Sequence, residues 1–276
     1  MTIPSLFIVT PVHNRRSVTT EFARTLSRQS LPQVVLVLVD DGSTDGTAEA
    51  VKEILPSTVV LRGNGNLWWA GGLQKGLNWL AAQTLPDHAM VAFMNDDVSF
   101  ENNFLDRATK ELKELATGCF LTVSGVFYPS GHRSNEAVVC DWAGYRYRDY
   151  GKHPEKIDCT TTRSLFMRWG DLRRVGGFHS TTLPHYLSDY EFTIRAHRRG
   201  IKLIPATTVL AQFDDVATGL HNTKGLRLGS KLRRLFSPRF SANPLYQFVY
   251  VWYACPFVWK IPSWCQIVFS TLRFLK

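Results

Sequence analysis

Three polar turns carry the side chains of this chain that could do chemistry, and each turn follows directly after a short apolar run. Residues 10–14 read TPVHN, residues 40–47 read DDGSTDGT, and residues 95–97 read NDD. Carboxylates that converge at one edge of a sheet repel each other unless a cation or the donor groups of a ligand compensate them. A divalent metal is the simplest compensator, and hard oxygen ligands favour Mg²⁺ or Mn²⁺. The turns therefore predict a metal-binding or ligand-binding edge.

The elements that must position these turns alternate between strand and helix. Four apolar, β-branched runs predict buried strands, at residues 6–9, 34–39, 58–61 and 90–94. Segments of helical pattern separate and follow them, at residues 17–29, 45–55, 70–82 and 103–115. This alternation indicates an α/β fold with a mostly parallel sheet flanked by helices. Ligands bind outside the carboxyl ends of such strands, which is where the three turns lie.

The chain becomes less regular beyond residue 116. Residues 122–127 predict a further strand, and the aromatic stretch 128–150 is typical of a hairpin or loop. A helix is expected to begin near Ser188, because Ser188 and Glu191 have the spacing of a capping box.

Plainer explanations exist for the second turn, and several nucleotide-binding motifs are absent. Asp45 or Thr44 can simply cap the following helix. A calcium loop starting at Asp41 fails, because its twelfth position is Lys52 where a bidentate Glu is required. The sequence contains neither G-x-G-x-x-G nor G-K-[ST], which removes the main support for a dehydrogenase or a P-loop ATPase.

Composition indicates a globular protein with a sizeable core. The chain has 276 residues, of which 45% are hydrophobic and 20% charged. Its 5 cysteines are odd in number and form no C-x-x-C, so neither a disulfide framework nor a zinc site is predicted. The first residues lack the basic and apolar regions of a signal peptide. We therefore expect a cytoplasmic protein.

The ordered motifs resemble the inverting nucleotide-sugar glycosyltransferases of family 2, which have the GT-A fold. Residues 8–14 look like the opening strand and turn of that family, and residues 39–45 are similar to its most recognisable motif. Residues 65–76 resemble its third segment in some polysaccharide-building members, and residues 95–97 fall where its metal-binding D-x-D belongs. The segment 175–191 falls where the acceptor-side motif and the base belong. The resemblance implies a GT-A-like domain over residues 1–215.

The resemblance also implies a role for individual residues. Asp189 would be the general base, and Asp97 would bind a metal that bridges the diphosphate of the donor. The residues expected at the nucleotide sugar are Pro11, His13, Asn14, Asp41, Asn66, Gly72, Lys75, Asn95 and Asp96. Those expected at the acceptor are Trp69, Trp142 and Glu191, although core packing is an equal alternative for the tryptophans.

The activity implied is metal-dependent, inverting transfer of a hexosyl or deoxyhexosyl group from a UDP- or dTDP-linked donor. The acceptor would be a hydroxyl of a glycan or of a lipid-linked sugar, in polysaccharide or cell-surface glycan synthesis. Two departures from the family pattern are Asn95 in the first D-x-D position and Ser188 where many relatives have Glu. Relatives often have a His near Gln212, for which His221 or Asp214 are the candidate substitutes.

Two other functions compete with sugar transfer. A nucleotidyltransferase acting on sugar phosphates would also use a parallel sheet and a metal-bound nucleotide, but it should carry a loop rich in Gly and Lys where this chain has residues 11–14. A non-catalytic nucleic-acid-binding protein would explain a basic C-terminal segment. It would leave the carboxylates unexplained, so we expect no nucleic-acid partner.

The excess charge of the chain lies in its C-terminal segment, residues 216–276. The net charge is +9, and this segment holds nine Lys or Arg residues and no acidic residue. Twelve aromatic residues follow from position 236 onward, and the apolar stretch 245–261 is too short and too interrupted to span a bilayer. We expect a peripheral contact with the cytosolic face of a membrane. The alternatives are packing on the catalytic domain or a contact between subunits of a homo-oligomer.

Overall fold

A computed structural model describes residues 6–128, 130–131, 133–134, 136–214 and 228–275 of the chain. Its centre is a seven-stranded sheet with the strand order β13-β6-β12-β4-β1-β2-β3. The strands are β1 (Leu6–Val12), β2 (Val34–Asp40), β3 (Val59–Arg62), β4 (Met90–Met94), β6 (Cys119–Thr122), β12 (Ser164–Arg168) and β13 (Lys202–Pro205). Within this sheet only β12 is antiparallel to its neighbours, which confirms the predicted mostly parallel α/β arrangement.

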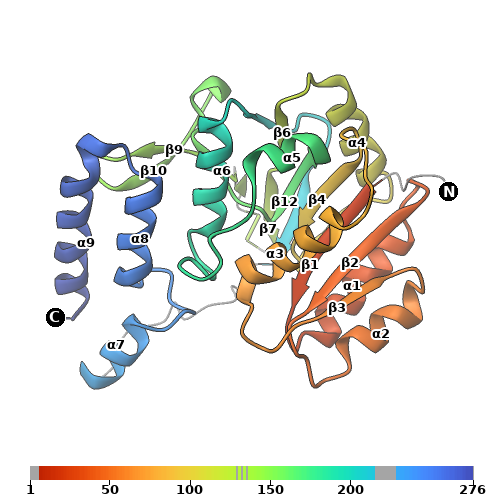
Figure 1. Cartoon of the computed structure of the whole chain (residues 1–276), viewed down its shortest axis with the longest axis horizontal. Coiled ribbons are helices and arrows are strands. Elements are labelled where there is room, and N and C mark those ends of the chain that lie inside the picture. Colours follow the sequence, from red (N-terminus) through yellow and green to blue (C-terminus); the bar gives the residue numbers. More distant parts are fainter. Residues whose placement is uncertain (1–5, 129, 132, 135, 215–227, 276) are drawn as a thin grey trace.

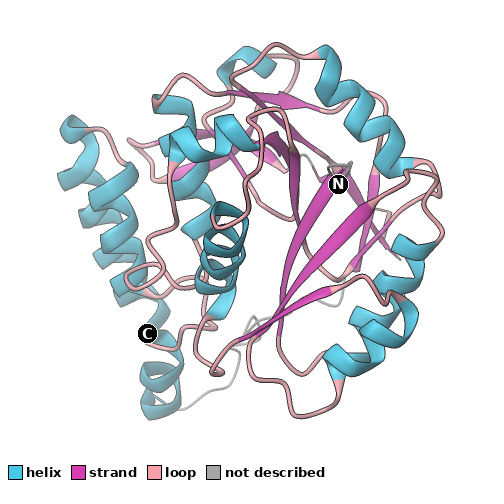
Figure 2. Cartoon of the chain, turned by 45° about the vertical axis from the view of Figure 1, so that its right-hand side comes forward, coloured by secondary structure: helices cyan, strands magenta, loops and turns pink. Residues whose placement is uncertain are grey.

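Helices cover both faces of the central sheet (Figures 1 and 2). One face carries α1 (Arg16–Ser27), α2 (Thr47–Ile54) and α4 (Phe104–Glu114), and the other carries α3 (Trp68–Ala81), α5 (Trp169–Val175) and α6 (Ser188–Arg198). Alternate side chains of β1 divide between these two layers: Leu6 and Ile8 pack with the first set, and Phe7 and Val9 with the second. A strand buried on both faces has no polar side, which is why the strands are continuous apolar runs in the sequence.

Two small sheets flank the central one. The first has the order β10-β9-β11 and consists of β9 (Ala137–Asp141), β10 (Arg146–Asp149) and β11 (Cys159–Thr160). The second has the order β5-β14-β7-β8 and consists of β5 (Val98–Ser99), β14 (Ala211–Asp214), β7 (Gly125–Tyr128) and β8 (Arg133–Ser134). The single strand expected at 122–127 is therefore divided between β6 and β7, and the predicted hairpin is β9 with β10.

The helix α6 begins at Ser188 as predicted, but the capping box is wrong. Leu187 precedes the helix with a left-handed backbone (φ 68°), and the Ser188 hydroxyl donates to the carbonyl of His185 at 2.5 Å. Glu191 is buried and accepts two hydrogen bonds from the Arg195 guanidinium, at 2.8 and 3.0 Å. A bidentate pair with arginine is stronger than a hydrogen bond to a backbone N–H, so Glu191 binds Arg195 instead of the helix start.

The helix α3 lies close to β1, because two of its glycines face the strand. A Cβ built on Gly72 would lie 2.5 Å from the Pro11 Cβ, and one built on Gly76 would lie 2.3 Å from a Val9 methyl group. Residues four apart share a helix face, so these two glycines form one contact surface. The structure therefore gives Gly72 and Pro11, both expected at the donor, a role in packing.

The C-terminal segment forms helices that pack partly on the rest of the fold. It contains α7 (Leu228–Leu235), α8 (Pro244–Ala254), the 3₁₀ helix η2 (Phe257–Trp259) and α9 (Lys260–Leu275). Tyr250 and Val251 of α8 are buried against Ile194 of α6 and Ile267 of α9. Among the described residues, none of the helices is both long and apolar enough to cross a membrane.

We expect Gly76→Ala to destabilise the protein by about 1–3 kcal/mol, because the added methyl group overlaps Val9 and separates α3 from β1. Chemical unfolding monitored by circular dichroism measures the change in the free energy of unfolding. Gly229→Ala is the matched control, since a Cβ at Gly229 in α7 meets no atom within 4 Å. The control should be neutral or slightly stabilising, because alanine favours a helix. Equal effects of the two changes would show that α3 and β1 are not tightly packed.

Candidate active site

The turns that follow β1 and β2 are joined by hydrogen bonds at one edge of the sheet. Val12 of β1 lies opposite Asp40 of β2, which brings the two turns together. The His13 Nδ1 atom lies 2.7 Å from the Asp41 carbonyl oxygen, and a carbonyl can only accept, so Nδ1 carries the proton. The Asn14 amide donates to His13 Nε2 at 3.2 Å and accepts from the Thr44 N–H at 2.8 Å. His13 and Asn14 are exposed, so this hydrogen-bonded edge is accessible to a ligand.

Asp45 connects the starts of two helices. Its carboxylate accepts from the N–H of Arg16, at the start of α1, at 3.0 Å and from the N–H of Thr47, at the start of α2, at 3.1 Å. A hydrogen bond from the Thr47 hydroxyl, with these N–H groups, lowers the pKa of Asp45. Asp45 therefore has the capping role that the sequence left open as the plainer explanation.

Asp41 holds the loop that leads into α3. Its Oδ1 accepts from the N–H of Gly65 at 2.8 Å, and its Oδ2 accepts from the N–H groups of Leu67 and Trp68 at 2.8 and 3.1 Å. A Cβ on Gly63 would lie 2.5 Å from Oδ1, so the loop can approach this closely only with glycine there. Both carboxylate oxygens are thus bound by the protein itself. This loop-holding role was not among the roles expected for Asp41.

Arg15 compensates the carboxylates that follow β4. Its Nε donates to Asp96 Oδ2 at 2.9 Å, and another guanidinium nitrogen donates to Asp97 Oδ2 at 3.3 Å. The Thr19 hydroxyl also donates to Asp96, at 2.7 Å. Burial raises the pKa of Asp96 despite these donors. Sequence reasoning missed Arg15, although it directly follows the first polar turn. Its guanidinium compensates part of the negative charge for which the sequence predicted a metal.

The residues present still fit a divalent metal whose other ligands are phosphate oxygens. The Asp97 side chain is 24% exposed, whereas that of Asp96 is 7% exposed, so Asp97 is the accessible carboxylate. Within the described part of the chain, His, Cys, Asp and Glu form no group of three that could hold a metal. Mg²⁺ is commonly bound by one or two carboxylates together with substrate phosphates. Of the candidate additional ligands, Asp214 ends β14, and His221 lies outside the described residues.

Asp189 lies in the first turn of α6, next to the same edge. Burial raises its pKa to about 6, while hydrogen bonds from backbone N–H groups oppose the shift. Arg163 connects Asp189 to the turn after β4: its charge acts on Asp189, and its carbonyl oxygen accepts from the Asn95 N–H at 2.9 Å. The Thr193 hydroxyl anchors α6 to the Thr160 carbonyl of β11 at 2.9 Å. Arg163 is a second residue that sequence reasoning missed.

The start of α3 is hydrogen-bonded to the two segments that lead to Arg163 and Asp189. The Trp69 indole N–H donates to the Thr162 hydroxyl at 2.8 Å, and the Ala70 N–H donates to the Pro184 carbonyl at 2.9 Å. These bonds join α3 to the segments before Arg163 and Asp189. Trp69 is half-buried, with its orientation set by Thr162.

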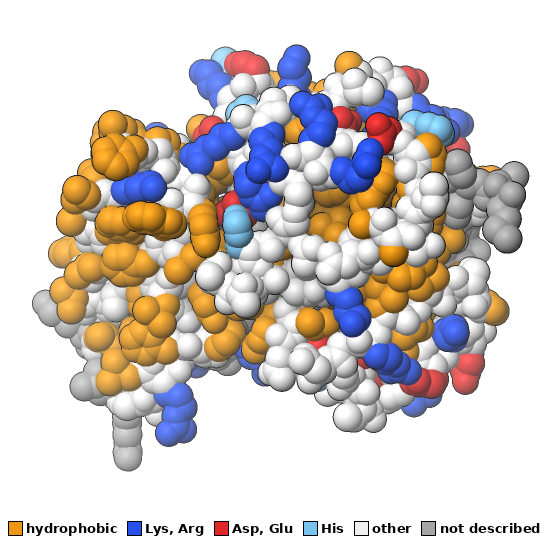
Figure 3. Space-filling model, in the orientation of Figure 1, with side chains coloured by type: hydrophobic (Ala, Val, Ile, Leu, Met, Phe, Trp, Pro, Cys, Tyr) orange, Lys and Arg blue, Asp and Glu red, His pale blue; other side chains and the backbone are white. Residues whose placement is uncertain are grey.

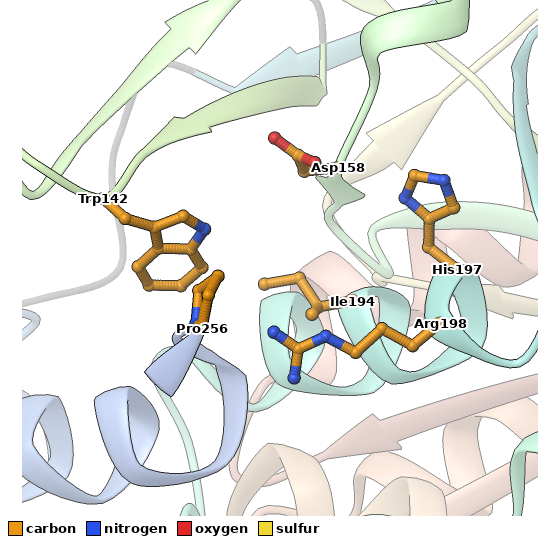
Figure 4. Close-up of a pocket in the computed structure, with 6 residues that line it drawn as sticks. All are labelled: Trp142, Asp158, Ile194, His197, Arg198 and Pro256. Carbon is orange, nitrogen blue, oxygen red and sulfur yellow. The ribbon is translucent and has the colours of Figure 1, made fainter. Parts of the chain in front are cut away.

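The other residues predicted for the site differ in how accessible they are and in how far they lie from this edge. Asn66 is exposed on the loop held by Asp41, and Lys75 is half-buried further along α3. Glu191 is buried in its pair with Arg195. Trp142 packs on Tyr250 and borders a separate cavity toward the other end of α6 (Figure 4).

We expect Asp41→Asn to destabilise the protein by about 1–3 kcal/mol and to loosen residues 65–68. The Asn side chain has only one acceptor atom. Its NH₂ group would therefore face a backbone N–H that the Asp41 carboxylate accepts in the wild type. Urea unfolding and amide hydrogen exchange of the loop measure the two effects. Glu53→Gln, which removes an exposed carboxylate from α2, is the control and should change neither. Unchanged exchange in Asp41→Asn would contradict the loop-holding role.

Solved glycosyltransferase structures share the arrangement of this chain. The mannosyltransferase PcManGT from Pyrobaculum calidifontis, in complex with GDP-Man and Mn²⁺, is 17% identical, with a TM-score of 0.57 over 99% of this chain and 76% of that one. TarS 1-349 from S. aureus, in complex with UDP-GlcNAc, is 13% identical, with a TM-score of 0.62 over 99% and 82%. GalNAc-T7 with UDP, GalNAc and Mn²⁺ is 10% identical, with a TM-score of 0.61 over 82% and 45%. At such identities the likeness shows a common GT-A-like fold.

Sequence comparison identifies the family. A search of curated protein sequences gives no match. The family profile described as Glycosyl transferase family 2 matches residues 7–170, which run from β1 into α5 and include the three polar turns and Arg15. The match covers more than half of the chain, and it ends before Asp189. Together with the sheet order and the edge described above, this family match shows that the chain belongs to glycosyl transferase family 2.

Proposed function

We propose that the chain transfers a hexosyl or deoxyhexosyl group from a UDP- or dTDP-linked donor to a hydroxyl of a glycan or lipid-linked acceptor, with inversion. The observation that carries this proposal is the position of Asp189. A carboxyl group with a raised pKa stands beside the sheet edge that presents the turns of the family. Polysaccharide or cell-surface glycan synthesis is the corresponding role in the cell.

The donor would lie across the turns after β1, β2 and β4. His13, Asn14 and Asn66 present exposed polar groups for the base and ribose, and Asn95 and Lys75 complete the expected contacts. The diphosphate would lie at Asp97 and Arg15, where the guanidinium already compensates two carboxylates. Mn²⁺ or Mg²⁺ held at Asp97 would supply positive charge against the charge that develops on the leaving diphosphate. Solved relatives in the fold contain GDP-Man or UDP-GlcNAc, which supports a nucleotide-sugar donor.

Asp189 would remove the proton from the acceptor hydroxyl as that oxygen attacks the anomeric carbon. A pKa of about 6 keeps most of this carboxyl ionised at neutral pH and makes it more basic than an exposed aspartate. Attack from the face opposite the leaving diphosphate inverts the anomeric configuration. Trp69, whose indole is oriented by the Thr162 hydroxyl, would offer an aromatic ring to the acceptor sugar. Glu191 would not contact the acceptor, because Arg195 already binds its buried carboxylate.

We expect Asp189→Asn to lower the turnover of transfer by roughly two to four powers of ten while donor affinity stays unchanged. The base acts when ionised, so wild-type turnover should rise with pH through about 6 and then level off. This rise should be absent from the residual activity of the variant. The measurement is product formation from a panel of nucleotide sugars with and without Mn²⁺.

Asp97→Ala is the contrasting variant in the same assay. It should lose the effect of Mn²⁺ on donor binding, measured as the Mn²⁺-dependent part of the thermal shift caused by the nucleotide sugar. Asp189→Asn should keep that shift. If Asp189→Asn loses donor binding and turnover equally, Asp189 has a structural role at the start of α6 and the proposed chemistry is wrong.

We also propose that the helices α7 to α9 contact a membrane surface. Large apolar side chains are exposed along them, namely Leu232, Phe236, Leu245, Trp252, Phe257, Val258, Trp259, Ile261, Val268, Phe269 and Leu272. Figure 3 shows this apolar surface over α8 and α9. Lys260 lies 4.5 Å from the Trp252 ring centroid, and Arg273 lies 5.4 Å from that of Phe269. Aromatic rings with adjacent cations suit the headgroup region of an anionic bilayer.

The replacement of Phe257 and Ile261 together by Ser should reduce flotation of the protein with anionic vesicles. Both side chains are exposed, so the fold should survive, whereas truncation before α8 would uncover the core that α8 shares with α6. Leu210→Ser, which changes an exposed leucine away from these helices, is the control. The proposal fails if both variants float like the wild type. A monomer produced only by the double variant, measured by light scattering, would indicate a contact between subunits instead.

A further inference from the structure

A cavity lies at the C-terminal half of α6, away from the candidate active site. Its volume is about 260 Å³, and its lining residues are Trp142, Asp158, Ile194, His197, Arg198 and Pro256 (Figure 4). His197 follows Asp189 by eight residues, which corresponds to ~12 Å along the helix axis. The cavity is therefore separate from the chemistry at Asp189, and nothing in the proposed transfer uses it.

The cavity contains side chains of both charges that do not pair with each other. The Asp158 carboxylate accepts the Cys140 N–H at 2.7 Å, and within the described chain it forms no ion pair. Arg198 is held in place because it donates to the carbonyls of Tyr253, at 3.1 Å, and Ala254. In Figure 4 Asp158 and Arg198 lie on different sides of the cavity. The space between opposite fixed charges suits a ligand that carries both charges itself.

The remaining lining residues add an aromatic ring and a further donor. The Trp142 indole lies beside Pro256, and its ring face can attract an ammonium group. The imidazole of His197 supplies a further N–H donor to the lining, apart from the Arg198 guanidinium (Figure 4). A simple anion would meet the repulsion of Asp158, and a neutral sugar would leave the charges of Asp158 and Arg198 without a partner.

The cavity borders the apolar surface of the C-terminal helices. Pro256 is followed by Phe257 and Val258, whose side chains are 88% and 73% exposed. These two residues are among the most exposed large apolar side chains of α7 to α9, which we propose to contact a membrane. A group bound in the cavity can therefore be attached to acyl chains that lie against η2.

We propose that this cavity binds the headgroup of phosphatidylethanolamine. The ammonium group donates to Asp158 and lies over the Trp142 ring, and the phosphate accepts from Arg198. A choline headgroup lacks N–H donors, so Asp158 favours ethanolamine over choline. The proposal rests on the membrane contact of α7 to α9 and is independent of sugar transfer.

The first test uses soluble headgroups and the full chain. Glycerophosphoethanolamine should bind, as measured by saturation-transfer NMR. Glycerophosphocholine and glycerol phosphate should bind at least about tenfold more weakly. A tenfold difference in affinity is at the low end of what a hydrogen bond to a charged group contributes. Asp158→Asn should remove the preference for ethanolamine while its amide oxygen still accepts the Cys140 N–H. Glu155→Gln, which removes an exposed carboxylate in the 3₁₀ helix η1 (Pro154–Lys156), is the matched control and should keep it.

The second test separates this proposal from the membrane contact on which it rests. Wild-type protein should float more with vesicles of phosphatidylcholine and phosphatidylethanolamine than with phosphatidylcholine alone, and Asp158→Asn should lose this difference. If the wild type floats equally with both, the membrane contact stands and the headgroup site is wrong. Equal binding of glycerol phosphate and glycerophosphoethanolamine would show that the cavity binds anions in general and would overturn the proposed headgroup site. If the protein floats with neither kind of vesicle, both the headgroup site and the membrane contact are wrong.

Discussion

Carboxylates at the carboxyl edge of a parallel sheet have to be compensated, and much of this structure depends on how the chain does so. Parallel strands end at one edge, so acidic residues that follow different strands meet there. Asp96 and Asp97 share the Arg15 guanidinium, and Asp41 accepts three backbone N–H groups. Each pairing also links segments that are distant in the sequence. The electrostatic requirement and the assembly of the edge are therefore met by the same contacts.

The pairing of Asp41 depends on the close packing of α3. The loop from Gly63 to Trp68 can present its N–H groups to Asp41 only if α3 begins close to the end of β2. The glycines at positions 72 and 76 allow this, because they remove the side chains that would hold α3 away from β1. The start of α3 in turn places Trp69 against Thr162, beside the segment that leads to Arg163. Packing on one face of the sheet thus determines where Trp69 lies relative to the segment that leads to Arg163.

Different surroundings separate the acidic residues of this edge into different roles. Asp45 receives hydrogen bonds at two helix starts, and its pKa is lowered, so it remains ionised and structural. Burial dominates at Asp189, and its pKa is raised to about 6. A pair of carboxylic acids whose environments shift their pKa values in opposite directions is a common basis for assigning acid and base roles. Burial raises the pKa of Asp96 as well, but Arg15 and Thr19 already bind that carboxylate. The contrast with Asp45 therefore supports Asp189 as the base.

The sequence by itself determined the alternation of strands and helices, the positions of the three polar turns and the start of α6, because these depend on local periodicity and on turn residues. It also carried the family, through residues 7–170. The tertiary structure alone decided which charges meet. Arg15 lies about 80 positions before Asp96, Glu191 binds Arg195 instead of capping its helix, and Gly72 packs on Pro11. Such partners depend on distances between elements brought together by packing, and no local pattern of residue types encodes those distances.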